Sequence, residues 1–313
     1  MNNSIVKNKI LSELPESIDY LIACAGFEKR CLSMVDFLPR DRVKNVGLFS
    51  YKQFNQFCDE QKSAFNDKFH CKEYTLDNSE PHTIADSFVA FFNDVELGAE
   101  KPNLVVDISS FTREAILIIL KIIEINKESF SEAYFFYRNA DVSDSLSDGI
   151  INVRSILGYM GDFDPSKPIH LVVLSGFEYE RAKGIIEIIE PAKISIGLGG
   201  ESESITEELR KKNQDFTDKL IAYYSSDDIF VFEHSLINLI DAKNTLCKVV
   251  NKYEDYNVVI APLNNKISTV AAGLLGISND AIQLCYSQMG SYNIKDYSSP
   301  LDDCIIVNIH QLL

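Results

Sequence analysis

The stretch "LIACAGFEKR" at residues 21–30 is an apolar run that changes abruptly to a glycine, an aromatic residue, an acid and two bases. The stretch "LVVLSGFEYER" at residues 171–181 shows the same change. A short apolar run that ends at a glycine turn is typical of a buried strand in a parallel sheet. The two stretches therefore predict two buried strands, each followed by a charged turn.

Three more pairs of segments follow the two GFE turns in the same order. They are "NVGLF" (45–49) with "SIGLG" (195–199), "LVVDISSFTR" (104–113) with "NVVIAPLNNK" (257–266), and "YFFYR" (134–138) with "QLCYS" (283–287). All these pairs lie about 150 residues apart, and collinear self-similarity at a nearly fixed spacing indicates an internal duplication. We therefore expect the chain to contain one domain twice.

Each half alternates short apolar runs with helical patterns, which is typical of a parallel sheet covered by helices on both faces. The sequence predicts an α/β protein of two tandem Rossmann-like halves, each a mainly parallel doubly wound sheet. The polar segment "GDFDPSKP" at 161–168 carries two prolines and suits a linker, so we place the halves at 1–163 and 164–313. The final segment "CIIVNIHQLL" predicts a further strand at a sheet edge.

Composition excludes several classes of partner. The formal net charge of -16 argues against binding to duplex nucleic acid, which depends on neutralising phosphates, but it leaves room for a small anion in a locally basic pocket. The N-terminus lacks the apolar core of a signal peptide, and the most apolar run, residues 115–125, is too short to span a membrane. We expect no membrane association.

The 7 cysteines are odd in number and show no CxxC spacing, which is typical of a reduced, cytoplasmic protein without a disulfide framework or a zinc site. The 5 histidines show no HxH or HExxH spacing. We expect neither a metal nor a cofactor.

The charged turns predict the place of a ligand site. In an open parallel sheet, ligands bind beyond the carboxyl ends of the strands, where the strand order reverses, and the first and fourth strands usually flank that crevice. Here the first strands end in "AGFEKR" and "SGFEYER", and the fourth strands end in "DISSFTR" and "APLNNK". We expect these four turns to surround a cleft between the two halves.

The residue types in these turns suit an anionic ligand. Glycine allows close backbone approach, small polar side chains bond phosphates or bases, and basic side chains pair with phosphate. The candidate binding residues are Gly26, Glu28, Arg30, Ser109, Ser110, Thr112, Arg113, Gly176, Glu178, Arg181, Asn264, Asn265 and Lys266. Arg113 and Lys266 hold equivalent places in the repeat, about one helical turn in, and we expect them to be paired phosphate anchors.

The two acids of the GFE turns, Glu28 and Glu178, have three open roles. They could clamp a neighbouring arginine, accept from a ribose hydroxyl or base amine, or act as a general base. A plainer interpretation is also open, in which each GFE turn only connects a strand to a helix and its acid caps that helix. Asp107 could cap its own helix in the same way, and Phe27 and Phe177 suit packing.

The turns "DISSFTREAIL" and "APLNNKISTVAA" resemble the fourth-strand signature of CARF domains, the CRISPR-associated Rossmann folds. Two such halves in one chain are similar to the SAVED architecture of antiphage signalling proteins. The resemblance implies a pocket between the halves for a cyclic oligonucleotide or a related nucleotide signal. On this basis Ser109, Thr112, Arg113, Asn264, Asn265 and Lys266 would be carried over as pocket residues. The doubled GFE lies outside the CARF pattern, and the two halves leave no length for a fused effector.

Three functions remain open from the sequence. The first is a nucleotide-sensing module that acts with a separate effector protein in bacterial antiviral defence. The second is an enzyme that processes a nucleotide or nucleoside with Glu28, Asp107 and Glu178 as candidate acid–base groups, although no GxSxG, P-loop or full GxGxxG motif is present. The third is a ligand-free assembly subunit that binds a partner through its acidic surface and the 201–212 helix. Homo-oligomerisation is also open.

The fourth-strand turns differ between the halves, because "DISSFTR" keeps an acid and three hydroxyls while "APLNNK" has neither. This difference favours an asymmetric ligand or a single active half.

Overall fold

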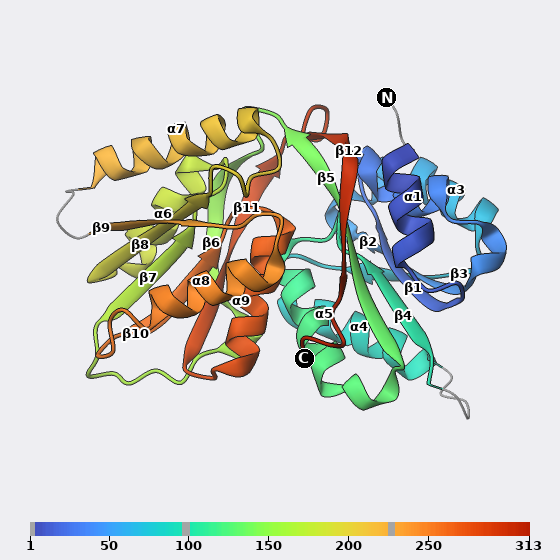
Figure 1. Ribbon diagram of the computed structural model, residues 1–313, viewed down its shortest axis with the longest axis horizontal. Coiled ribbons are helices and arrows are strands. Elements are labelled where there is room, and N and C mark those ends of the chain that lie inside the picture. Colours follow the sequence, from blue (N-terminus) through green and yellow to red (C-terminus); the bar gives the residue numbers. More distant parts are fainter. Residues whose placement is uncertain (1–3, 96–100, 225–228) are drawn as a thin grey trace. The chain divides into compact units, whose positions relative to one another are not determined.

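A computed structural model describes residues 4–95, 101–224 and 229–313 (Figure 1). The chain divides into two compact units, the first formed by Met1–Val142 with Ile294–Leu313 and the second by Ser143–Asn293. Each unit contains one six-stranded sheet, mostly parallel, with helices packed on its faces. The predicted α/β class, with two Rossmann-like halves, is confirmed.

The first unit alternates strands and helices along most of its length. Its strands are β1 (Ile18–Ala25), β2 (Val43–Tyr51), β3 (Cys71–Leu76), β4 (Asn103–Asp107), β5 (Glu132–Val142) and β12 (Ser298–Asn308). Its α-helices are α1 (Ser4–Glu13), α2 (Ser33–Phe37), α3 (Asp59–Lys68), α4 (Pro81–Asp94) and α5 (Arg113–Ile125). Its short 3₁₀ helices are η1 (Lys29–Leu32), η2 (Arg40–Arg42), η3 (Lys52–Phe57) and η4 (Lys127–Ser129).

The second unit repeats the pattern. Its strands are β6 (Ser147–Met160), β7 (Ile169–Leu174), β8 (Lys193–Gly199), β9 (Ile229–His234), β10 (Asn257–Pro262) and β11 (Ile282–Tyr292). Its helices are α6 (Tyr179–Ile189), α7 (Glu207–Tyr223), α8 (Leu239–Val250) and α9 (Lys266–Ser278).

Both sheets have the same topology. The strand order is β12-β5-β4-β1-β2-β3 in the first unit and β6-β11-β10-β7-β8-β9 in the second. In the first unit, β2 and β3 are added on one side of β1, and β4 and β5 are added on its other side. The second unit does the same around β7, so the strand order reverses between β1 and β4 and between β7 and β10. This is the topology of a doubly wound sheet, and it defines one switch point in each unit.

The last strand of each repeat belongs to the other unit. β6 follows β5 in sequence but pairs antiparallel with β11, whereas β12 follows β11 and pairs antiparallel with β5. Figure 1 shows β5 and β12 side by side at the edge of their sheet. The division at residues 163 and 164 follows the repeat along the chain, and the compact units differ from it by this exchange of one strand.

Sheet register fixes which residues of the two repeats are equivalent. Ile22 lies opposite Gly47 and Val106, and its counterpart Val172 lies opposite Ser195 and Ile260. The register therefore differs by two residues from the predicted match of "NVGLF" with "SIGLG". It differs by one residue from the predicted match of the strand part of "LVVDISSFTR" with "NVVIAPLNNK". Asp107 thus corresponds to Ala261. The match of "YFFYR" with "QLCYS" agrees with the register of β5 and β11.

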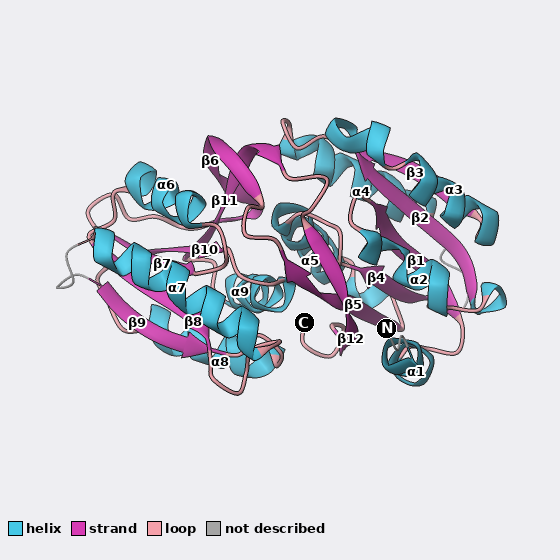
Figure 2. Ribbon diagram, turned by 90° about the horizontal axis from the view of Figure 1, so that it is seen from above, coloured by secondary structure: helices cyan, strands magenta, loops and turns pink. Residues whose placement is uncertain are grey.

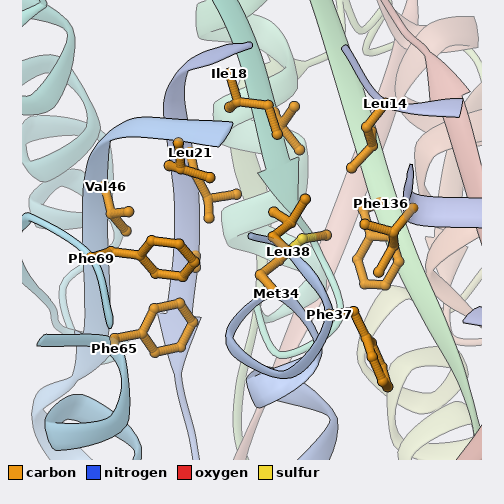
Figure 3. Close-up of a cluster of buried hydrophobic side chains, with 14 of the residues drawn as sticks. Leu14, Ile18, Leu21, Met34, Phe37, Leu38, Val46, Phe65, Phe69 and Phe136 are labelled. Atoms are coloured by element: carbon orange, nitrogen blue, oxygen red, sulfur yellow. The ribbon is translucent and has the colours of Figure 1, made fainter. Parts of the chain in front are cut away.

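Apolar residues on both faces of the first sheet explain its layers. Figure 3 shows one face, where Leu21, Met34, Phe65 and Phe69 lie in a buried cluster with residues of α1, α2 and α3. The other face packs on α4 and α5 (Figure 2), where Phe49 contacts rings of α4. Burial on both faces requires strands without polar alternation, as the apolar runs predicted.

No helix in the described ranges is long and apolar enough to cross a membrane.

Candidate functional site

The turns that the sequence singled out lie at the two switch points. β1 pairs with β4, and β7 pairs with β10, so the first and fourth strands of each repeat are neighbours with parallel carboxyl ends. The GFE turns directly follow the ends of β1 and β7. The predicted positions of these turns in each sheet are confirmed, while the prediction of one ligand shared by both halves stays a prediction.

Each GFE acid forms a buried ion pair with an arginine. Glu28 lies 2.8 Å from Arg30, and Glu178 lies 3.0 Å from Arg181. Neither acid makes a side-chain cap to the helix that follows it, so the capping interpretation of these acids is wrong. Of the three roles considered, the structure shows the first, in which each acid pairs with a neighbouring arginine.

The two arginines occupy equivalent places although they are one residue out of register in the sequence. Arg30 donates to the carbonyl oxygen of Arg138 and lies 5.7 Å from the ring centre of Tyr137. Arg181 donates to the carbonyl oxygen of Ser287 and lies 5.3 Å from the ring centre of Tyr286. The match arises because a 3₁₀ helix follows the first GFE turn at Lys29, whereas an α-helix follows the second at Tyr179.

A serine completes each ion pair. The hydroxyl of Ser298 donates to Glu28, and that of Ser147 donates to Glu178. These serines are the first residues of β12 and β6, the two exchanged strands. We call each set a strand anchor: Glu28, Arg30 and Ser298 in the first unit, and Glu178, Arg181 and Ser147 in the second. The doubled GFE motif therefore holds the start of an exchanged strand.

The turn between β4 and α5 is held mainly by neighbouring parts of its own unit. Ser109 Oγ accepts from the backbone N–H of Arg138 at 2.9 Å. Thr112 caps α5 by accepting from the N–H of Ala115 at 3.2 Å, and it exchanges two hydrogen bonds with the hydroxyl of Tyr51. Thr112, not Asp107, is thus the helix cap.

Asp107 is a buried acid with spare bonding capacity. Its Oδ1 accepts from the N–H of Ser109 at 3.0 Å, but no hydrogen-bond partner for its Oδ2 is found among the described residues. Burial raises the pKa of Asp107 to about 7, and the hydrogen bonds of Ser109 and the charges of Arg30 and Arg138 oppose that rise. A carboxyl group with this pKa is an acid or base candidate near neutral pH.

The raised pKa predicts how Asp107 affects stability. Its folded-state pKa exceeds the unfolded value, so the folded protein holds the proton more tightly and loses stability as the pH rises from about 4 to about 7. Asp107→Asn should remove this loss, with an upper limit of about 4 kcal/mol. Urea unfolding of wild type and variant at pH 4 to 8 measures it, with exposed Asp41→Asn as control. A gain from Asp107→Asn that did not grow with pH would contradict the prediction.

The polar side chains of the turn between β10 and α9 form hydrogen bonds within the second unit. Asn264 donates to the carbonyl oxygen of Ser175, at the start of the neighbouring GFE turn. Asn265 caps α9 by accepting from the N–H of Ser268 at 3.0 Å and also donates to the carbonyl oxygen of Leu236. Both amides predicted to meet a ligand therefore bond to backbone groups of neighbouring turns in their own unit.

Arg113 and Lys266 have equivalent positions. Each is the first residue of its helix, α5 or α9, and each is half-buried. The expectation that they lie one helical turn in is wrong, because the capping residues directly precede them. At the first position the side chain lies beside the backbone N–H groups that a helix leaves unbonded.

The glycines of the two GFE turns differ in their surroundings. A Cβ atom at Gly176 would lie 2.1 Å from the carbonyl oxygen of Leu263, so the turns after β7 and β10 touch through their backbones. A Cβ atom at Gly26 would meet only the Cβ of Ser110, at 3.5 Å. Glycine is therefore required at position 176 by the packing of its own unit, whereas position 26 has room for a Cβ atom.

Several residues of these sites were missed by sequence reasoning. They are Ser147, Ser298, Tyr51 and Asn213, the last of which donates to the carbonyl oxygens of Ser175 and Gly176. A signal for the two serines existed, because they stand 151 positions apart, in line with the repeat. Tyr51 and Asn213 had no such signal, since their contacts depend on the fold.

Two Rossmann-like units with polar switch-point turns define the class of the protein. No known protein-family model matches the sequence, and no curated protein shows significant similarity to it. Within the described residues, no group of three or more His, Cys, Asp or Glu side chains could hold a metal ion.

Proposed function

We propose that the protein is a nucleotide-signal sensor that binds an anionic nucleotide or cyclic oligonucleotide at a switch point. Its output would pass to a separate effector protein in bacterial antiviral defence. The sensing role is supported by the cation at the start of a helix beside a switch point, and the defence role by the resemblance of "DISSFTR" and "APLNNK" to the CARF signature.

One observation carries the proposal. In both repeats, a short turn follows the fourth strand, and a half-buried cation then begins the next helix. This cation is Arg113 in α5 and Lys266 in α9. Unbonded N–H groups at a helix start attract anions, and a basic side chain beside them strengthens that attraction.

If the protein is an enzyme, Asp107 is the best of its three candidate acid–base groups. Glu28 and Glu178 each already bond to an arginine and a serine in their strand anchors, so their carboxylate oxygens are occupied. Asp107, with a pKa of about 7 and an unbonded Oδ2 within the described structure, is the acid–base group that an enzyme would use. Hydrolysis or transfer of a bound nucleotide would favour that alternative.

Calorimetric titration tests the proposal. The panel comprises adenosine and guanosine mono-, di- and triphosphates, cyclic mononucleotides, cyclic dinucleotides and cyclic tri-adenylate. We expect wild type to bind at least one of them and Arg113→Ala to bind it roughly ten- to a hundredfold more weakly, because a charge-assisted contact to phosphate contributes about 1.5 to 3 kcal/mol.

The control is Lys44→Ala, which removes an exposed cation at the amino end of β2, away from the switch point, and should leave affinity unchanged. If wild type binds no member of the panel, the sensor proposal fails and the assembly-subunit function takes its place.

A further inference from the structure

The two switch points differ in how tightly their turns pack. In the second unit, the backbone of Gly176 touches that of Leu263, and Asn264 bonds across to the carbonyl oxygen of Ser175. The N–H of Leu263 also donates to the carbonyl oxygen of Leu174 at 3.0 Å. The turns after β7 and β10 are therefore joined to each other, which leaves little space for a ligand between them.

The first unit holds its fourth-strand turn differently. The bonds of Ser109 run to Arg138 on β5, and those of Thr112 run to Tyr51 on β2. Beside Gly26 there is space for a Cβ atom in ordinary contact with Ser110. This turn, residues 108–112, is also one residue longer than residues 262–265, counted from the equivalent Asp107 and Ala261 to the helix starts. The first switch point is thus less tightly closed.

Polar atoms distinguish the two turns further. In the described part of the first unit, Asp107 Oδ2 and Ser110 Oγ are buried and lack hydrogen-bond partners. Their counterparts in the second unit are Ala261, by register, and Leu263, by distance from the helix start, and both are apolar. Buried polar atoms without partners are rare because they are unfavourable, so they point to a missing bonding partner.

We propose, on the basis of the proposed function, that only the first unit binds the nucleotide. Its phosphate lies at the start of α5 beside Arg113, and its hydroxyl or amine groups bond to Asp107 and Ser110. The second switch point is a structural counterpart, and Lys266 takes no part in binding. This departs from the sequence-based expectation that both cations anchor phosphate.

Binding at the first unit requires a local movement. Asp107 Oδ2 and Ser110 Oγ are covered by protein, so a ligand reaches them only when the atoms that cover them move aside. Beyond Ile108, whose N–H donates to the carbonyl oxygen of Phe136 on β5, the turn bonds to Arg138 and Tyr51 through side chains. Residues 109–112 can therefore move without breaking the strand pairing of β4.

Matched variants test the proposal with the panel nucleotide that binds wild type most tightly. Arg113→Ala should weaken binding at least tenfold, whereas Lys266→Ala should change the Kd by less than twofold. Ser110→Ala should weaken binding about fivefold without lowering the thermal midpoint, because its hydroxyl makes no hydrogen bond within the described structure. That combination separates a binding role from a structural one.

Equal weakening by Lys266→Ala and Arg113→Ala, or weakening by Lys266→Ala alone, would overturn the one-sided site while leaving the sensor function standing. Unchanged affinity in both Ser110→Ala and Arg113→Ala would also overturn it. Absence of any binding by wild type would remove the sensor function and the one-sided site together.

Discussion

The Gly176→Ala variant is expected to lose at least about 3 kcal/mol of unfolding free energy, and Gly26→Ala to change by less than about 1 kcal/mol. The new Cβ at position 176 would lie 2.1 Å from the carbonyl oxygen and 2.9 Å from the carbonyl carbon of Leu263. Both are backbone atoms of the turn after β10, and that turn bonds to the turn after β7, so relief requires the two turns to separate. At position 26 the nearest atom is 3.5 Å away, which is ordinary contact.

Alanine at position 26 could even raise stability slightly, because Gly→Ala reduces the freedom of the unfolded chain where the folded backbone accepts it. The chain has no tryptophan, so urea unfolding would be followed by far-UV circular dichroism or tyrosine fluorescence. Similar stabilities for the two variants would contradict the difference in packing between the switch points.

The strand anchors predict the second large effect. Arg181→Met should cost about 3 to 5 kcal/mol, because it leaves the buried carboxylate of Glu178 without its cation. The Glu178→Gln/Arg181→Met double variant should regain part of this loss, since no unpaired charge remains. Hydrogen exchange in β6 should rise in the single variant, because Ser147 at the start of β6 bonds to the same carboxylate.

An exposed pair in the same unit supplies the control. Arg210 and Glu207 lie 3.0 Å apart on the surface of α7, where water screens an ion pair and leaves it little effect on stability. Arg210→Met should therefore be nearly neutral. If Arg181→Met were equally mild, the anchor would not hold the exchanged strand.

Local patterns predicted much of the fold. Strands buried on both faces produce continuous apolar runs, and a duplication repeats them in order, so both halves and their switch points followed from the sequence. The exchange of β6 and β12 could not be predicted from the sequence. The partner of an edge strand depends on the direction that the chain takes in the preceding turn, and residue patterns do not show that direction. β6 also alternates buried and exposed residues only weakly, which hid it as a strand.

The site was predicted by position better than by role. A carboxylate such as Glu28 can bond to many kinds of partner, so its pairing with Arg30 was one of several possibilities. Its bond with Ser298 depends on a strand that comes from the other end of the chain. The shift between Arg30 and Arg181 likewise disappears only when η1 and α6 are compared in space. Helix caps could be guessed by residue type, yet the choice of Thr112 over Asp107 depends on where α5 begins.

Hydrogen–deuterium exchange of the wild type, with and without a saturating amount of its tightest panel nucleotide, tests most directly whether the first switch point is a nucleotide site. The nucleotide should alter exchange in residues 108–114, where the turn moves and α5 begins, and should leave residues 262–266 unchanged. Altered exchange in residues 262–266, or unaltered exchange in residues 108–114, would contradict a nucleotide site in the first unit.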